Sequence, residues 1–162
     1  MTTVAVVSDT HLPRGARRLP EACLEQLRGA DLILHGGDFT GASVLEELRA
    51  LGPPVEAVRG NMDDAALRAA LPAERVVEAG GARIGIVHDG GLRAGREARL
   101  AARFPRCHAV VYGHTHVPQV ERFGEVWVLN PGSPTERRSA PRHSLLVLEI
   151  EAGEIRPQLV TV

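Results

Sequence analysis

The stretch from Val111 to Pro118, "VYGHTHVP", places His114 and His116 on either side of one threonine, directly after an apolar run. Residues two apart in an extended or turning chain project to the same side, so the two imidazoles can reach one point in space. Imidazole nitrogen is a common metal ligand in proteins. The pattern therefore predicts part of a metal site, provided that partners come from elsewhere in the chain.

Such partners occur at regular intervals earlier in the sequence, each after a short apolar run: Asp9 with His11, then Asp38, Asn61 and His88. The steps are 38 − 9 = 29, 61 − 38 = 23, 88 − 61 = 27 and 114 − 88 = 26 residues, close to the roughly 30 residues of one strand-helix-strand unit. Such steps return the chain to the same edge of a sheet, where ligands bind in open α/β proteins. Taken singly, Gly-Asp and Gly-Asn pairs are ordinary turn residues, but the ordered set of seven favours one shared site.

The elements that must position these residues follow from hydrophobic spacing. Short apolar strands are predicted over residues 3–7, 31–34, 55–58, 75–78, 83–87 and 108–111, and helices over residues 21–28, 42–51, 64–70 and 96–104. The Gly80-Gly81 pair predicts a hairpin turn. Four further strands without helices follow, over residues 119–122, 125–129, 144–151 and 155–162. In the third of these, Leu146, Leu148 and Ile150 form one apolar face, and Pro157 indicates that the last is an edge strand.

This order predicts an α/β protein with two sheets packed face to face and helices outside, in a single domain spanning residues 1–162. The apolar fraction of 44% and the formal net charge of −1 are typical of a globular domain and create no field that attracts nucleic acid. Cys23 and Cys107 are expected to be buried free thiols, because neither has a CxxC partner. Without a signal-like segment or an apolar run of about 18 residues, the chain is expected to be cytoplasmic, with no membrane contact.

Five short motifs carry a family resemblance: "SDTH" at 8–11, "GGD" at 36–38, "GN" at 60–61, "VHD" at 87–89 and "GHTH" at 113–116. Together they resemble the signature of the calcineurin-like metallophosphoesterases. The short chain and the "NPGS" at 130–133 are similar to the small bacterial and archaeal phosphodiesterases of that superfamily. The resemblance spans about residues 3 to 150 and implies a four-layer α/β/β/α sandwich with two divalent metal ions.

Carried over by position, the resemblance implies that Asp9, His11 and His116 hold one metal, that Asn61, His88 and His114 hold the other, and that Asp38 bridges both. Mixed imidazole and oxygen ligands without thiolate suit Mn²⁺, Fe²⁺, Co²⁺, Ni²⁺ or Zn²⁺, and the family favours Mn²⁺. Two cations, two carboxylates and one metal-bound hydroxide leave a net charge of +1, which matches a phosphodiester monoanion. Attack by that hydroxide is the expected mechanism. Asp38, Asn61 and His88 are the expected catalytic residues, and Asn61 is also expected to contact substrate.

Two positions depart from the family pattern. Related enzymes often carry a histidine after the metal-binding asparagine, where it protonates the leaving oxygen; this chain has Met62, whose thioether donates no proton. We therefore expect a preference for leaving groups of low pKa. Relatives also often have an "HGH" pattern where this chain reads His88-Asp89-Gly90-Gly91, so the substrate contacts expected there are in doubt.

Several other polar residues have weaker assignments. His35 and Asp89 are expected to position the metal ligands through hydrogen bonds around them. For His35, the commoner role is that of a buried core histidine whose hydrogen bonds are satisfied. Arg14 is a candidate substrate contact, with a plain exposed loop arginine as the alternative. A row of arginines at 93, 96, 99, 103 and 106 is expected to form a solvated helix face, with a partner or nucleic-acid surface as the sharper alternative.

The sequence thus predicts a dinuclear-metal phosphodiesterase that hydrolyses small or activated phosphodiesters. A phosphomonoesterase or a nuclease of the same superfamily remains an alternative, but the near-neutral charge and few aromatic residues argue against nucleic acid as a partner. A catalytically silent binding scaffold, as in the similar retromer subunit of eukaryotes, is the rival from another class. Homo-oligomerisation is left open.

Overall fold

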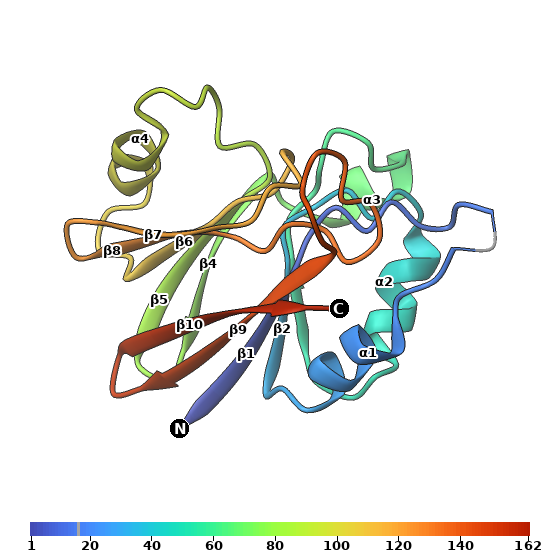
Figure 1. Ribbon diagram of the computed structural model, residues 1–162, viewed down its shortest axis with the longest axis horizontal. Coiled ribbons are helices and arrows are strands. Elements are labelled where there is room, and N and C mark those ends of the chain that lie inside the picture. Colours follow the sequence, from blue (N-terminus) through green and yellow to red (C-terminus); the bar gives the residue numbers. More distant parts are fainter. Residues whose placement is uncertain (16) are drawn as a thin grey trace.

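Strands in the computed structural model, which describes residues 1–15 and 17–162, form two five-stranded mixed sheets (Figure 1). The first sheet has the order β10 (Glu154–Thr161), β9 (Ser144–Glu151), β1 (Thr2–Val7), β2 (Leu32–His35) and β3 (Val55–Ala57). The second has the order β4 (Glu74–Ala79), β5 (Ala82–Val87), β6 (Ala109–Val111), β8 (Val126–Asn130) and β7 (Gln119–Phe123). Strands β1, β2 and β3 are parallel, as are β5, β6 and β8. The carboxyl ends of each parallel set therefore meet at one edge of its sheet.

Four helices cover the outer faces in the described part of the chain: α1 (Glu21–Arg28), α2 (Ala42–Arg49), α3 (Ala65–Ala70) and α4 (Arg96–Arg103). The first three lie on the side of the first sheet and α4 lies on the side of the second (Figure 1). None of these helices combines the length and the apolar character needed to cross a membrane.

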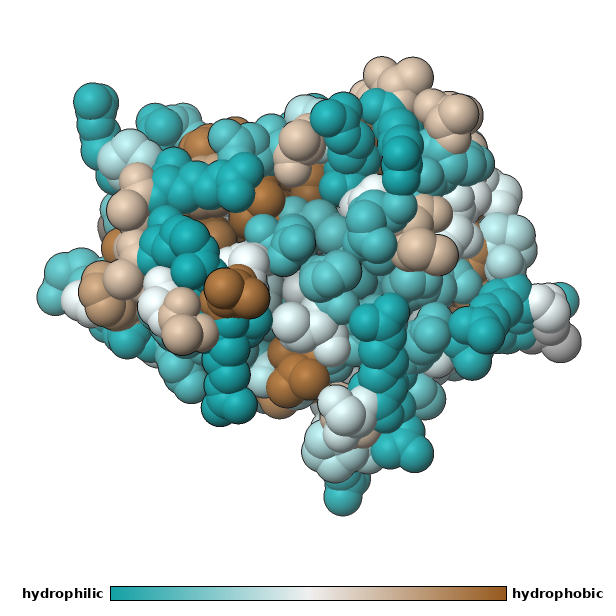
Figure 2. Space-filling model, turned by 90° about the horizontal axis from the view of Figure 1, so that it is seen from above, coloured by the Kyte–Doolittle hydropathy of each residue, from teal (hydrophilic) through white to brown (hydrophobic). Residues whose placement is uncertain are grey.

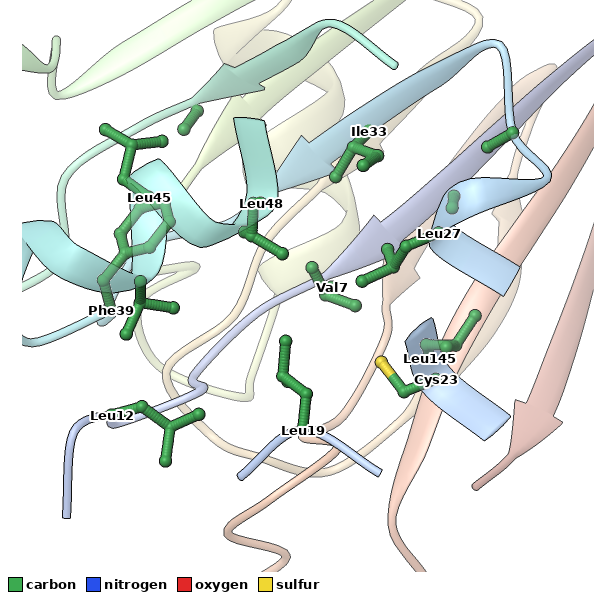
Figure 3. Close-up of a cluster of buried hydrophobic side chains, with 14 of the residues drawn as sticks. Val7, Leu12, Leu19, Cys23, Leu27, Ile33, Phe39, Leu45, Leu48 and Leu145 are labelled. Atoms are coloured by element: carbon green, nitrogen blue, oxygen red, sulfur yellow. The ribbon is translucent and has the colours of Figure 1, made fainter. Parts of the chain in front are cut away.

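Alternating side chains of β1 separate two of the hydrophobic layers. Ala5 and Val7 pack with Leu27 of α1 and Leu48 of α2 in the layer under the helices, which Figure 3 shows in close-up. Val4 and Val6 belong to the layer between the sheets, together with apolar side chains from one face of β5 and one face of β9. This alternation is the physical basis of the predicted four-layer sandwich, which the structure confirms.

The outermost layer, between α4 and the second sheet, depends on a close approach of helix to strand. Leu100 and Phe104 pack on Val110 and Val128. A Cβ atom on Gly85 of β5 would lie 2.5 Å from the ring of Phe104, well inside van der Waals contact. Glycine at this position lets α4 lie directly on the sheet.

The predicted hairpins are confirmed in their pairing. β4 pairs with β5 around Gly80 and Gly81, and β9 pairs with β10 around Ala152 and Gly153. The Pro157 strand, β10, lies at the edge of the first sheet as predicted. One expectation is corrected: the ligand-bearing strand ends belong to two sheet edges, because β1, β2 and β3 lie in the first sheet, whereas β5 and β6 lie in the second.

Candidate metal centre

The loops after β1, β2, β3, β5 and β6 meet at one end of the sandwich, and Figure 2 views the molecule from this end. One set of potential ligand atoms, from Asp9, His11 and His116, lies within 4.8 Å of one another. A second set with the same spread comes from Asp38, His88 and His114. The Asn61 Oδ1 atom lies 3.0 Å from both His88 Nε2 and His114 Nδ1. All seven predicted residues are therefore brought together. We call Asp9, His11 and His116 the first ligand group, and Asn61, His88 and His114 the second.

Asp38 lies between the two groups and faces both with a single oxygen. Its Oδ2 atom is 3.5 Å from His11 Nε2 and 3.2 Å from His88 Nε2. Its Oδ1 atom accepts a hydrogen bond of 2.7 Å from the Met62 backbone N–H. The Met62 amide therefore engages Oδ1 and leaves Oδ2 as the atom that faces both groups.

Two of the histidines are held in one tautomer by backbone carbonyls. His88 Nδ1–H donates to Gly36 O at 2.7 Å, and His116 Nδ1–H donates to Glu136 O. In each neutral ring the proton on Nδ1 leaves the lone pair on Nε2. These Nε2 atoms face the carboxylates, with His116 Nε2 3.4 Å from Asp9 Oδ1. A fixed tautomer of this kind is typical of metal-ligating histidines.

Three buried atoms of the first ligand group have no hydrogen-bond partner among the described residues: Asp9 Oδ1, His11 Nε2 and His116 Nε2. Leaving a buried polar atom unsatisfied costs about 1–3 kcal/mol, and native proteins contain few such atoms. Here the three converge on one another instead of being scattered through the core. A divalent cation would satisfy all of them, and nitrogen with carboxylate oxygen suits a first-row transition metal. The residues present therefore fit the metal ions that the sequence predicts.

Neighbouring charges in the site favour the ionised forms of Asp9, Asp38 and His88. Burial alone would raise the pKa of Asp9, but His11 and His116 hold it well below its usual range. The pKa of Asp38 is also lowered against the effect of burial, chiefly by His88. Burial lowers the pKa of His88, yet the carboxylates of Asp38 and Asp9 outweigh it and raise the pKa above its ordinary value. Bound protons on histidine and bound cations would therefore compete for the same negative charge.

The ligand loops adopt strained backbone conformations. Positive φ angles occur at Asp9 (57°), Asp38 (60°), His114 (69°) and His116 (61°), and also at His11 (46°). Each such angle in a residue other than glycine costs on the order of 1–3 kcal/mol unless the surroundings enforce it. Strain concentrated in the ligand loops is typical of a functional site.

Asp63 holds three of these loop positions, and the sequence analysis missed it. Its buried carboxylate accepts backbone hydrogen bonds from Gly60 at 2.7 Å and from Asp38 and Thr40 at 3.2 Å each. Burial raises the pKa of Asp63 despite these bonds. Its place two residues after Asn61 was the only sequence signal for this role.

The "NPGS" segment forms hydrogen bonds with the loops of the first ligand group. Ser133 Oγ donates to Asp9 O at 2.8 Å and accepts from Glu136 N–H at 2.8 Å. Asn130 Nδ2 donates to Gly113 O at 3.2 Å. The Glu136 carboxylate, which the sequence analysis also missed, lies 3.9 Å from His11 Nδ1. Residues 130–136 therefore act on the ligands through the backbone and through the Glu136 carboxylate.

His35 is fully buried and braces two ligand loops without touching a ligand side chain directly. Its Nδ1 atom accepts from Gly37 N–H at 3.0 Å, so Nε2–H donates to Thr10 Oγ1 at 3.2 Å. Its ring stacks on Phe39 with centroids 3.6 Å apart, and burial lowers its pKa to about 3. His35 is therefore neutral at ordinary pH, and its expected support of the site stays a prediction.

The remaining candidates lie further from the ligand atoms. Asp89 is exposed and accepts from Gly91 N–H at 2.8 Å, within its own turn. Arg14 is exposed, and its guanidinium lies 3.3 Å from the Glu136 carboxylate. Arg96 and Arg99 correct the solvated-face expectation in part, because both donate to backbone carbonyls of residues 90–94.

Comparisons with known proteins agree with this geometry. A model of the calcineurin-like phosphoesterase superfamily domain matches residues 2–153. A probable metallophosphoesterase of Methanothermobacter thermautotrophicus is 35% identical over 159 residues, covering 97% of this chain and 91% of that protein.

Two solved structures are also similar. Wild-type Vps29 of Entamoeba histolytica, complexed with Zn²⁺, has a TM-score of 0.78 at 25% identity, covering 98% of each chain. A structure described as a novel archaeal phosphodiesterase has a TM-score of 0.75 at 23% identity, covering 98% of this chain and 99% of that one; this likeness concerns the fold. On the family match and the curated relative, the chain belongs to the calcineurin-like phosphoesterase superfamily and is a metal-dependent phosphoesterase.

Proposed function

We propose that the protein is a dinuclear-metal phosphodiesterase that acts on small or activated phosphodiesters. The observation that carries this proposal is the arrangement of two ligand groups around the single Asp38 Oδ2 atom, 3.5 Å from His11 Nε2 and 3.2 Å from His88 Nε2. Two separate groups with one shared carboxylate oxygen suit a pair of cations better than a single one.

In this proposal the first ligand group holds one cation, the second ligand group holds the other, and Asp38 joins them. Mn²⁺ is the proposed metal, with Fe²⁺, Co²⁺, Ni²⁺ and Zn²⁺ as alternatives that the same ligands accommodate. When bound, such cations supply Lewis acidity that activates water and neutralises phosphate charge. The catalytic assignment of Asp38, Asn61 and His88 rests on their position at the centre and at the open side of the site.

The chain's own residues have distinct proposed tasks. Asn61 lines the cleft beside the site and offers its amide N–H to a phosphate oxygen while Oδ1 faces the histidines. His88 is positioned through the Gly36 carbonyl and keeps its Nε2 lone pair toward Asp38. Met62 supplies a backbone N–H to Asp38 but no side-chain proton for the leaving group. Esters with good leaving groups are therefore the proposed substrates.

A protein-binding scaffold is the second candidate function, and the similarity to Vps29 favours it. The filled ligand set argues for catalysis, because a scaffold has no need of seven converging polar side chains, five of them on strained backbone. The buried free thiols of Cys23 and Cys107 support the proposed cytoplasmic location, since such thiols persist in reducing compartments.

Hydrolysis of bis-p-nitrophenyl phosphate and p-nitrophenyl phosphate across a panel of divalent metals tests this function. We expect faster turnover of the diester with Mn²⁺, and an Asp38→Asn variant that stays folded should lose activity by orders of magnitude. Preference for the monoester would favour a phosphomonoesterase instead, and rapid degradation of single-stranded DNA with Mn²⁺ would favour a nuclease. A wild-type protein that binds no metal would leave the scaffold as the better candidate.

A further inference from the structure

A cleft of about 810 Å³ opens beside the second ligand group, and four of its lining residues are arginines: Arg59, Arg68, Arg99 and Arg103. We call it the arginine cleft. Asn61, His88 and His114 line its inner end. Among the described residues, Asp89 is the one acidic side chain in this lining. The volume is within the range of small-ligand pockets, roughly 300–1,000 Å³.

The positive charge of three of these arginines is not neutralised by an acid. Arg59 donates to Arg68 O at 3.3 Å, Arg68 donates to Asn61 O at 2.6 Å, and Arg99 donates to Leu92 O at 2.6 Å. Within residues 1–15 and 17–162, none of the three guanidinium groups has a carboxylate within 4.0 Å. Backbone carbonyls fix the orientation of a guanidinium but leave its full charge. Together the three groups create a positive potential at the mouth of the second ligand group.

Arg103, on α4, is the fourth arginine that lines the arginine cleft. Its Nε–H donates to Glu74 at 2.7 Å, and both side chains are about half exposed. A guanidinium has five N–H donors, so this bond leaves donors for a ligand.

The opposite side of the metal centre has a different balance. Arg14 and Arg17 lie 3.3 Å and 3.7 Å from the carboxylate of Glu136, which also lies 3.9 Å from His11. In the described part of the chain, Arg59, Arg68 and Arg99 have no such acidic partner, so the arginine cleft keeps its positive charge next to the second ligand group. A substrate that matches this cleft carries additional negative charge on that side of the scissile phosphate.

We propose that the arginine cleft binds a second phosphate group of the substrate, so that the substrates are small diesters with a further phosphate on that side. This inference rests on the proposed phosphodiesterase function. Guanidinium groups bind phosphate through paired hydrogen bonds, and the cleft joins the metal centre directly through Asn61 and His88. A polymer fits less well, because proteins that hold single-stranded nucleic acid stack its bases on aromatic side chains, and aromatic residues make up 3% of the chain.

A matched substrate pair isolates the second phosphate. The p-nitrophenyl ester of thymidine 5′-phosphate and the same ester with an additional 3′-phosphate share the scissile bond and the leaving group. We expect kcat/KM with Mn²⁺ to be higher for the bisphosphate, and the ratio to fall roughly 3- to 10-fold in Arg103→Gln, the range of a partly screened charge-assisted contact. Arg103→Lys should retain part of the ratio, and Arg103→Glu should lower it further.

Arg49→Gln is the matched control. Arg49 is also an exposed helix arginine paired with one glutamate, Glu46 at 2.8 Å, but it lies on α2 and does not line the arginine cleft. Its ratio should equal that of the wild type. A ratio that stays the same in Arg103→Gln and Arg103→Glu would overturn the proposal.

A binding measurement separates this proposal from the proposed function. In EDTA, calorimetry should give tighter binding of thymidine 3′,5′-bisphosphate than of thymidine 5′-phosphate, with the difference reduced in Arg103→Gln and kept in Arg49→Gln. If the protein hydrolyses neither ester but shows this difference, the cleft is supported and the phosphodiesterase function fails. If both esters are hydrolysed equally and both nucleotides bind equally, the function stands and the cleft proposal fails. Faster cleavage of a single-stranded oligonucleotide than of the bisphosphate ester would overturn the assignment to small substrates.

Discussion

His88 Nε2 lies 3.2 Å from Asp38 Oδ2, although His88 follows a strand of the second sheet and Asp38 follows a strand of the first. The contact thus joins the two halves of the sandwich at the end where the ligand loops meet. The position of His88 is fixed through Gly36, in the same loop as Asp38. The packing of the two sheets is therefore what sets the geometry of the metal centre.

Replacing His88 by alanine should weaken one of the two cation sites selectively. We expect calorimetry with Mn²⁺ to show two bound ions in the wild type and one in His88→Ala. At the site that loses His88, the affinity for Mn²⁺ should fall by more than the roughly 10- to 100-fold that loss of an outer-shell partner causes. His143→Ala is the control, because His143 is not among the seven ligand residues. Two ions bound with unchanged affinity to His88→Ala would contradict the second ligand group.

Replacing Gly113 by alanine should displace Asp9. A Cβ atom at this position would lie 2.1 Å from Ser8 Oγ and 2.6 Å from Asp9 Oδ2, and overpacking of a buried site costs about 1–3 kcal/mol. We expect chemical denaturation to show a loss in that range, together with weaker Mn²⁺ binding. Gly29→Ala should change stability by less than about 0.5 kcal/mol, because Gly29 has a φ of −81° and its nearest contact would be an ordinary 3.4 Å. Equal losses of stability in Gly113→Ala and Gly29→Ala would refute the close approach of the Gly113 backbone to Ser8 and Asp9.

Replacing Met62 by histidine should extend the substrate range to poor leaving groups. Met62 is 56% exposed, and its bond to Asp38 uses the backbone N–H, which any residue except proline keeps. A positioned general acid contributes about 10²-fold or more, so hydrolysis of 3′,5′-cyclic AMP, which has an alkoxide leaving group, should rise by about that factor relative to bis-p-nitrophenyl phosphate. Met62→Gln, with no titratable proton, should not reproduce the gain. A wild-type protein that already hydrolyses both esters at equal rates would contradict the expected preference for leaving groups of low pKa.

The metal-free protein should lose stability in mild acid through His35. Burial lowers the pKa of His35 to about 3, below the roughly 6.5 of an unfolded histidine. Between these values the unfolded chain binds the additional proton, so the stability due to neutral His35 is complete above about pH 6.5 and is lost as the pH falls. From pH 7 to pH 5 this amounts to about 2 kcal/mol. Urea denaturation in EDTA should show a smaller pH dependence for His35→Gln than for the wild type; identical slopes would contradict the neutral buried imidazole.

The sequence predicted the layers, the hairpins and the seven converging residues, because hydrophobic alternation and strand-end spacing are local signals. It did not predict that Asp38 would face both groups with one oxygen, since this depends on the Met62 amide 24 positions away in the chain. Asp63 was missed for a similar reason, because it binds the backbone N–H groups of Asp38 and Thr40, which lie 25 and 23 positions away. Glu136 was missed because its carboxylate faces His11, which lies more than 100 positions earlier in the chain. The arginines of α4 were misjudged in part because their partners are carbonyls of a loop, which carry no sequence signature.

Anomalous diffraction from crystals grown with Mn²⁺ tests the central claim most directly. Two manganese peaks are expected about 3.5–4 Å apart, one among Asp9, His11 and His116, the other among Asn61, His88 and His114, with Asp38 in contact with both. A single manganese peak, or none, in crystals grown with an excess of Mn²⁺ would contradict the dinuclear centre.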